Sequence, residues 1–104
     1  MTTDRAELFA SADIILQVQS FGSNNENSDA DLALLRSGQL IIGMMDPLAS
    51  PQAAQAVADK GATAIALELV PRISRAQSMD VLSSMATLAG YKAVLMGASA
   101  APRI

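Results

Sequence analysis

Polar side chains that could bind a ligand are concentrated in residues 68–84, directly after an apolar segment. Arginine guanidinium groups pair with phosphates and carboxylates, and an aspartate can orient a guanidinium or accept a hydrogen bond from a ribose hydroxyl. Glutamine and serine add neutral donors and acceptors that suit a carboxamide. The polar residues of this candidate site are Arg72, Ser74, Arg75, Gln77, Ser78, Asp80 and Ser83.

The same residues also fit the start of a helix. Ser74 and Gln77 have the spacing of a capping box, and Ser78 with Asp80 would suit a helix that begins at Met79. Capping boxes are common in proteins, and arginines in loops are often only solvated. The spacing alone therefore leaves a ligand site and a capped helix as alternatives.

Three strand-length apolar segments alternate with helical segments along the chain. Pro51 suits the first position of a helix that follows Ser50, and Gly61 after Lys60 is placed to end it. In order, we expect the end of a short helix at 5–10, a strand at 12–18, a loop at 20–28, a helix at 28–36, a strand at 39–45, a helix at 51–60, a strand at 62–67 and a long helix at 79–98.

This order predicts the α/β fold class. Strands joined by helical crossovers form a parallel sheet with right-handed connections. We expect a partial flavodoxin- or Rossmann-like three-layer domain with about three strands, followed by the long helix. Ligands bind at the carboxyl ends of such strands, where residues 68–84 begin. In the long helix, Val81, Met85, Leu88 and Leu95 recur at helical spacing and predict one buried face.

The composition disfavours several classes of function. The 104 residues include no cysteine and no histidine, so we expect no metal site. The net charge is −3 and the basic residues are scattered, which disfavours nucleic-acid binding. No apolar run approaches the roughly 18 residues that span a bilayer. No secretory signal is recognisable either, so we expect a cytoplasmic location.

The predicted fold is small for a complete domain. A parallel sheet needs helices on both faces, and three strands leave two open edges. Only two crossover helices are available, and no strand follows the long helix. We therefore expect a fragment of a larger protein, the alternative being a very small flavodoxin-like domain closed by dimerisation.

The run ELVPRISRAQSMDVLSSMATLAGYKAV, residues 68–94, closely resembles the NAD(H)-binding alpha subunit of proton-translocating NAD(P) transhydrogenases. These proteins share the alanine dehydrogenase/transhydrogenase N-terminal domain family. The resemblance extends over residues 12–104 and includes the upstream segments ADIILQVQ and GMMDPLASP. It implies that residues 1–78 are the C-terminal portion of an α/β N-terminal domain. Residues 79–104 would be a long helix leading toward a dinucleotide-binding domain that this chain lacks.

The resemblance also implies roles for four residues, carried over by position. Arg72 and Asp80 would hold each other and the carboxamide–ribose region of NAD(H), and Ser83 would contact the carboxamide. Gln77 would reach toward the partner nucleotide, so Gln77 and Asp80 are the residues expected to act in catalysis. Hydride transfer between two nicotinamides needs ring alignment and no protein acid or base, which is compatible with the absence of histidine.

Cofactors and partners follow from the same resemblance. It implies NAD(H) on this subunit, NADP(H) on a partner component, and no metal. The implied assembly is a homodimer at the cytoplasmic face of the membrane, bound to membrane-spanning and NADP-binding subunits. The isolated chain is expected to be inactive, because it has no G-x-G-x-x-G motif to bind the pyrophosphate.

Two departures and two rival functions accompany this interpretation. The loop at 20–28 is longer and more polar than the family segment, and Gln17 stands where a lysine is usual.

An alanine dehydrogenase-like oxidoreductase would need a general base, but residues 44–49, which should hold its histidine, read MMDPLA. The other rival is a non-catalytic nucleotide-binding or assembly module.

Overall fold

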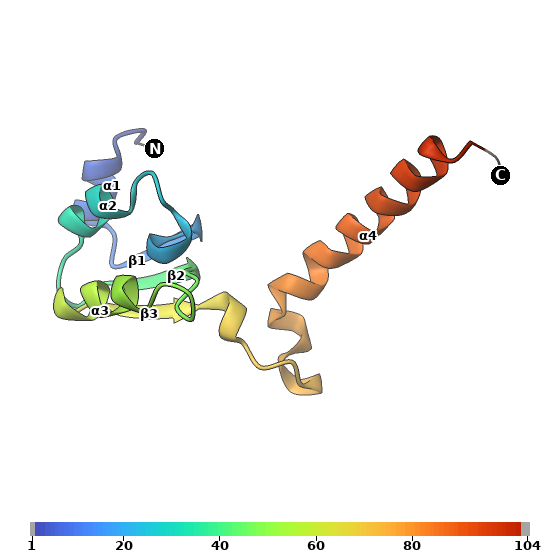
Figure 1. The fold of residues 1–104 in the computed structure, drawn as a ribbon. Helices are drawn as coiled ribbons and strands as arrows, with labels where there is room; N and C mark the ends of the chain where they lie inside the picture. The colour runs from blue at the N-terminus through green and yellow to red at the C-terminus, as the bar shows by residue number, and fades with distance from the viewer. Residues whose placement is uncertain (1, 103–104) are drawn as a thin grey trace. The chain divides into compact units, whose positions relative to one another are not determined.

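The computed structural model describes residues 2–102, and its internal contacts divide the chain into Met1–Leu69 and Val70–Ile104. We treat these as two units. The first contains α1 (Arg5–Ser11), β1 (Ile14–Gln19), a 3₁₀ turn (Phe21–Ser23), α2 (Ser28–Leu34), β2 (Leu40–Met44), α3 (Pro51–Asp59), β3 (Thr63–Ala66) and a second 3₁₀ turn (Leu67–Leu69) (Figure 1). The second contains a 3₁₀ helix (Ser74–Met79) and α4 (Val81–Ala100).

The sheet of the first unit confirms the predicted α/β class. Its strands lie in the order β1-β2-β3, and both neighbouring pairs are parallel. The register places Leu16 beside Ile42 and Ile42 beside Ile65. Both connections between strands contain a helix, as parallel pairing requires. All three strand carboxyl ends therefore lie at one edge of the sheet.

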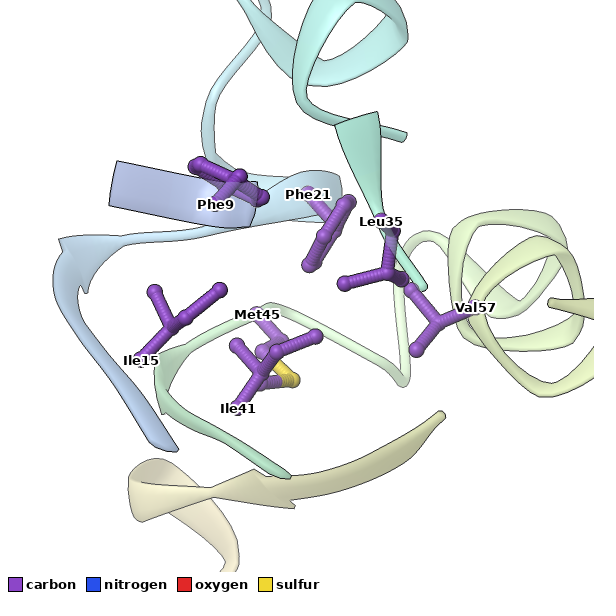
Figure 2. Packing of buried hydrophobic residues seen from close by; sticks show 7 residues of the cluster. All are labelled: Phe9, Ile15, Phe21, Leu35, Ile41, Met45 and Val57. Atoms are coloured by element: carbon purple, nitrogen blue, oxygen red, sulfur yellow. The ribbon is translucent and has the colours of Figure 1, made fainter. Parts of the chain in front are cut away.

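The core lies on one face of this sheet. Ile15 and Ile41 project from neighbouring strands toward side chains of the helices and the first 3₁₀ turn (Figure 2). The buried cluster is Phe9, Ile15, Phe21, Leu35, Ile41, Met45 and Val57. Because helices α1 and α3 both contribute to this cluster, the helices form one layer over one face. The predicted partial three-layer arrangement is thus present as a sheet and one helical layer.

The opposite face of the sheet carries apolar side chains in contact with solvent. Leu16 is 74% exposed, and Ile14 of the same strand and Ile65 of β3 are exposed as well. Strands alternate their side chains between the two faces, so these residues lie on the face opposite Ile15 and Ile41. The first unit therefore buries only one of the two apolar faces that its strands provide.

Turn residues end the helices where the sequence predicts. Gly61 has φ +72° after α3, and Gly38 has φ +84° before β2, conformations that favour glycine. Ser50 precedes α3 with Pro51 at the first helical turn, although the Ser50 side chain makes no capping hydrogen bond. The predicted loop at 20–28 contains the 3₁₀ turn Phe21–Ser23, which its polar composition did not indicate.

A partly buried ion pair joins α1 to α2. Arg5 Nε and Nη2 donate to the two carboxylate oxygens of Asp31 at 2.5 Å each, and Gln17 Nε2 donates to Asp31 Oδ2 at 3.0 Å. The sequence predicts Asp31 only as a residue of a helix start. In the structure its side chain is fully buried, whereas that of Arg5 is about half exposed (52%). This contact ties the N-terminal helix to the rest of the unit.

The prediction of one buried face on α4 is wrong. Met85, Leu88 and Leu95 are all at least half exposed, and no described residue of α4 is buried. The four residues that predicted the buried face are only some of the apolar residues of α4. Val94 lies on the side of the helix opposite Met85 and is also exposed, and Leu82 lies between these two sides. A helix that is apolar on all sides has no single stripe to define a buried face.

Helix α4 also differs from the expectation that no apolar run approaches the length of a membrane span. By length and composition, Val81–Ala100 could cross a bilayer, with a mean hydropathy of 1.2. A search for an uninterrupted apolar run misses it, because small residues and the single charge of Lys92 lie among the large apolar ones. The core helix of a soluble protein meets the same criterion, so the finding assigns α4 to neither environment.

Candidate functional site

The four residues predicted to contact NAD(H) all lie in the second unit, around the start of α4. Arg72 precedes the 3₁₀ helix Ser74–Met79, which contains Gln77, and Asp80 and Ser83 lie at the beginning of α4. Ala76 is the buried residue of this 3₁₀ helix. The chain therefore turns tightly between Arg72 and Asp80, which brings side chains from both ends of the segment together.

These side chains line one depression of about 320 Å³. Its lining consists of Arg72, Ile73, Ser74, Gln77, Asp80 and Ser83. All four residues of the predicted set are included, whereas Arg75 and Ser78 are not. The depression thus combines a cation, a carboxylate, an amide and hydroxyl groups, the polar groups that a ribose and a carboxamide can bind.

Asp80 is held by hydrogen bonds from Ser83. The Ser83 backbone N–H donates to Asp80 Oδ1 at 3.0 Å, and the Ser83 hydroxyl donates to Asp80 Oδ2 at 2.6 Å. Asp80 is thereby the N-cap of α4, which begins at Val81 and not at Met79. Since the Ser83 hydroxyl proton is used, its oxygen lone pairs are left to accept a hydrogen bond from a ligand.

The electrostatics of Asp80 follow from these contacts. The hydroxyl of Ser83 is the largest cause that lowers the pKa of the Asp80 carboxyl, followed by the Ser83 backbone N–H. The charge of Arg72 lowers this pKa further as a smaller contribution. Among the described residues, however, Arg72 makes no salt bridge with Asp80, so the expected direct pairing of these two side chains is absent. The capping contacts from Ser83 therefore stabilise the ionised form of the Asp80 carboxyl.

Replacing Ser83 with alanine should raise the pKa of Asp80 toward its ordinary value, because the largest cause of the depression is removed. A carboxyl whose folded pKa is depressed stabilises the helix start above its unfolded pKa. That contribution is lost as the pH falls through the folded value. Carboxyl ¹³C NMR titration measures the change. Ser84→Ala is the control, since the Ser84 backbone N–H donates to the Asp80 carbonyl and Ser84 is not among the causes that lower the pKa of Asp80. An equal change in both variants would contradict this role for Ser83.

The spacing of residues 74–80 left a ligand site and a capped helix start as alternatives, and the structure decides which residues cap the helix. Asp80 caps α4, while Ser74 lies inside the 3₁₀ helix, whose N-cap position, Ile73, has no side-chain hydrogen bond. The Ser74–Gln77 capping box is therefore not formed. Within residues 2–102, the Gln77 and Arg72 side chains make no hydrogen bond and stay available to a ligand. Capping of α4 thus involves Asp80 and Ser83, and it leaves the side chains of Arg72 and Gln77 unused.

A second depression of about 320 Å³ lies in the first unit, between the 20–29 loop and the start of α3. Its lining includes two carboxylates, Glu26 and Asp29, and contains no arginine or lysine. A dinucleotide carries negative phosphates, which carboxylates repel. The depression beside Arg72 is therefore the better candidate for a nucleotide.

Sequence reasoning missed two groups of residues. Along the sequence Glu68 is only the start of the polar segment, yet its carboxylate accepts hydrogen bonds from the backbone after β2. The Arg5–Asp31–Gln17 contact was also missed, although the departure at Gln17 marked the position. Both groups connect residues at least 14 positions apart, so no local pattern could reveal them.

Comparison with known proteins shows what the chain is related to. The sequence profile of the family described as alanine dehydrogenase/PNT, N-terminal domain, matches residues 1–89, most of the chain. The chain belongs to this family. A structural relative agrees: the crystal structure of transhydrogenase from Sinorhizobium meliloti has 44% sequence identity and a TM-score of 0.81, covering 96% of this chain and 28% of that chain.

The curated relatives that this chain matches include transhydrogenase subunits. The NAD(P) transhydrogenase subunit alpha of Cereibacter sphaeroides is 44% identical over 90 residues, 86% of this chain and 16% of that protein. The NAD(P) transhydrogenase subunit alpha of Haemophilus influenzae is 36% identical over 93 residues, 89% of this chain and 17% of that protein. The chain thus spans less than a fifth of the length of these two relatives.

Proposed function

We propose that this chain supplies a portion of the NAD(H) site of a proton-translocating NAD(P) transhydrogenase, which transfers a hydride between NADH and NADP⁺. The observation that carries the proposal is the depression shared by Arg72, Gln77, Asp80 and Ser83. Support also comes from the transhydrogenase subunits among its relatives. Residues 1–78 would belong to the N-terminal domain, and residues 79–104 would lead toward a dinucleotide-binding domain.

The side chains would act by binding and orienting. Arg72 would attract the negatively charged nucleotide, and the Asp80 carboxylate would accept from a ribose hydroxyl. The Ser83 oxygen, whose proton is directed to Asp80, would accept from the carboxamide amino group. Gln77 would reach toward the partner nucleotide. When both nucleotides are bound, the nicotinamide rings themselves supply the hydride chemistry, so alignment is the protein's contribution.

The assembly in this proposal has three components. This subunit would form a homodimer that holds NAD(H), and a partner component would hold NADP(H). A membrane-spanning subunit would couple the reaction to proton movement, and this chain would be peripheral to the membrane on its cytoplasmic side. The names of the relatives as alpha subunits support an assembly with other subunits.

The rival functions are less well supported. An alanine dehydrogenase-like reaction removes a proton from the substrate amine and needs a general base, for which this chain offers no histidine. The Gln17 amide, at the usual lysine position, donates to the buried carboxylate of Asp31. A non-catalytic nucleotide-binding or assembly module predicts nucleotide binding without turnover, and the following experiment separates it.

A chimeric subunit tests the proposed function. The matching segment of the Cereibacter sphaeroides alpha subunit would be replaced with this chain's residues and combined with the remaining transhydrogenase components. We expect hydride transfer between NADH and an NADP⁺ analogue at a rate within about tenfold of the parent. A folded chimera that binds NADH without turnover would favour the non-catalytic module.

In the same chimera, Arg72→Ala should mainly weaken NADH binding. A charge-assisted hydrogen bond contributes about 1.5–3 kcal/mol, so we expect the dissociation constant to rise about 10- to 100-fold. The hydride-transfer rate at saturating NADH should change much less. Titration calorimetry and single-turnover kinetics measure the two quantities. Arg75→Ala is the control, because Arg75 lies outside the depression, and an unchanged affinity for Arg72→Ala would remove Arg72 from the site.

A further inference from the structure

The carboxylate of Glu68 connects the end of β3 to the backbone that follows β2. One oxygen, Oε1, accepts the N–H of Met45 at 2.6 Å and also that of Asp46. The other oxygen, Oε2, is buried and has no hydrogen-bond partner among the described residues. A single side chain thus satisfies two consecutive backbone donors 22 and 23 positions away.

The turn that Glu68 holds has an unusual backbone. Asp46 has φ +47°, in the left-handed region that non-glycine residues rarely adopt. Consecutive N–H groups around a left-handed residue form a concavity that favours an anion. Glu68 supplies that anion from within the chain. Its charge therefore opposes the tendency of Asp46 to relax to an ordinary conformation.

The same turn is fixed on its other side by the segment after β1. The Ser20 N–H donates to the Met44 carbonyl at 2.9 Å, and the Ser23 hydroxyl donates to the same oxygen. Gly22 approaches so closely that a Cβ there would lie 2.2 Å from the Met45 carbonyl oxygen. The turn that binds the Glu68 carboxylate is therefore hydrogen-bonded from two sides, by Glu68 and by the segment after β1.

We propose that Glu68 is a positioning residue that fixes the start of the candidate nucleotide segment. The first unit ends at Leu69, the residue after Glu68, and Arg72 lies four residues after Glu68. Because the Glu68 side chain is hydrogen-bonded to the turn after β2, the backbone of the next residues, 69 and 70, is restricted in position. A role of Glu68 in hydride transfer rests on the proposed function. Its role in ordering residues 69 and 70 does not.

The ordering is tested in the 104-residue chain with Glu68→Gln. The amide keeps the shape and one acceptor oxygen but loses the charge and places an NH₂ group at the buried position of Oε2. We expect at least about tenfold faster hydrogen exchange at Met45 and Asp46, and lower NMR order parameters at Leu69 and Val70. Glu26→Gln is the matched control, since Glu26 is an exposed glutamate in the same unit.

A second comparison separates positioning from general loosening. Val57→Ala removes buried core volume distant in sequence from Glu68 and should lower stability without changing the order of Leu69 and Val70. Equal loss of order in Val57→Ala and Glu68→Gln would overturn the proposal. Faster exchange confined to Met45 and Asp46, or no change at all, would overturn it as well.

A further variant covers the case in which Glu68→Gln fails to fold. Adding Asp46→Gly removes the strain of the left-handed residue and should restore folding, while Leu69 and Val70 stay disordered. An ordered Leu69–Val70 segment in this double variant would contradict the proposal. In the chimera, Glu68→Gln should slow hydride transfer about tenfold at a temperature well below its melting temperature. If the chimera with Glu68 intact is inactive, the proposed function fails, and the order parameters still decide the role of Glu68.

Discussion

Replacing Arg5 with alanine should lower the free energy of unfolding of the first unit by about 3 kcal/mol at neutral pH, the cost of leaving a buried carboxylate without its cation. The Asp31 side chain is fully buried, and Arg5 supplies two of its three hydrogen bonds. Arg5 itself is about half exposed, so the estimate is at the low end of the range for buried pairs. Thermal and urea unfolding at pH 7 measure the loss.

The same contact predicts how stability depends on pH. The hydrogen bond from Arg5 is the largest cause that lowers the pKa of Asp31, although burial acts in the opposite direction. Above the unfolded pKa of about 4, the ion pair contributes fully to stability. The contribution is lost as the pH falls through the lower folded pKa. Arg5→Ala should therefore weaken or reverse the acid dependence seen in the original protein.

A double-mutant cycle isolates the pair. Asp31→Asn removes the charge, and in its presence Arg5→Ala should cost about 2 kcal/mol less than it does alone. Arg36→Ala is the control, because Arg36 donates to the backbone carbonyls of Phe9 and Ala12 and, among residues 2–102, to no carboxylate. It should reduce stability without altering the acid profile. Identical pH profiles for Arg5→Ala and the original protein would show that the ion pair contributes nothing.

The second large effect is expected on catalysis. In the chimeric subunit, Gln77→Asn and Asp80→Asn should each slow hydride transfer about 100-fold, the scale of a small misplacement of reacting groups. NADH affinity should change by no more than about threefold, which is under about 1 kcal/mol. Both residues line the candidate depression, and both substitutions keep hydrogen-bonding groups there. Single-turnover rates and calorimetric titration give the two numbers.

Asp80→Asn also separates the two roles of Asp80. Asparagine caps helices about as well as aspartate, so the start of α4 should be preserved while the charge toward the ligand is lost. Ser78→Ala provides the control, since Ser78 lies between these residues but outside the depression. Equal losses in rate and affinity would reassign Gln77 and Asp80 to simple binding. An unchanged rate for both would remove them from the reaction.

The sequence by itself determined the features that depend on nearby residues. Strand-length apolar runs, Pro51 after Ser50 and Gly61 after Lys60 predicted the alternating elements, because propensities and caps act over a few positions. The order of those elements then predicted the parallel sheet. Close resemblance over residues 68–94 indicated the family and the candidate residues, and the profile match confirmed the family.

Tertiary structure alone decided which distant groups meet. The burial of Asp31 against Arg5 and the attachment of Glu68 to the turn after β2 depend on how the folded chain places side chains that are more than 20 positions apart. The wrong prediction of a buried face on α4 has the same origin. Periodicity identifies apolar residues, but burial depends on what packs against them, which no spacing along one helix contains.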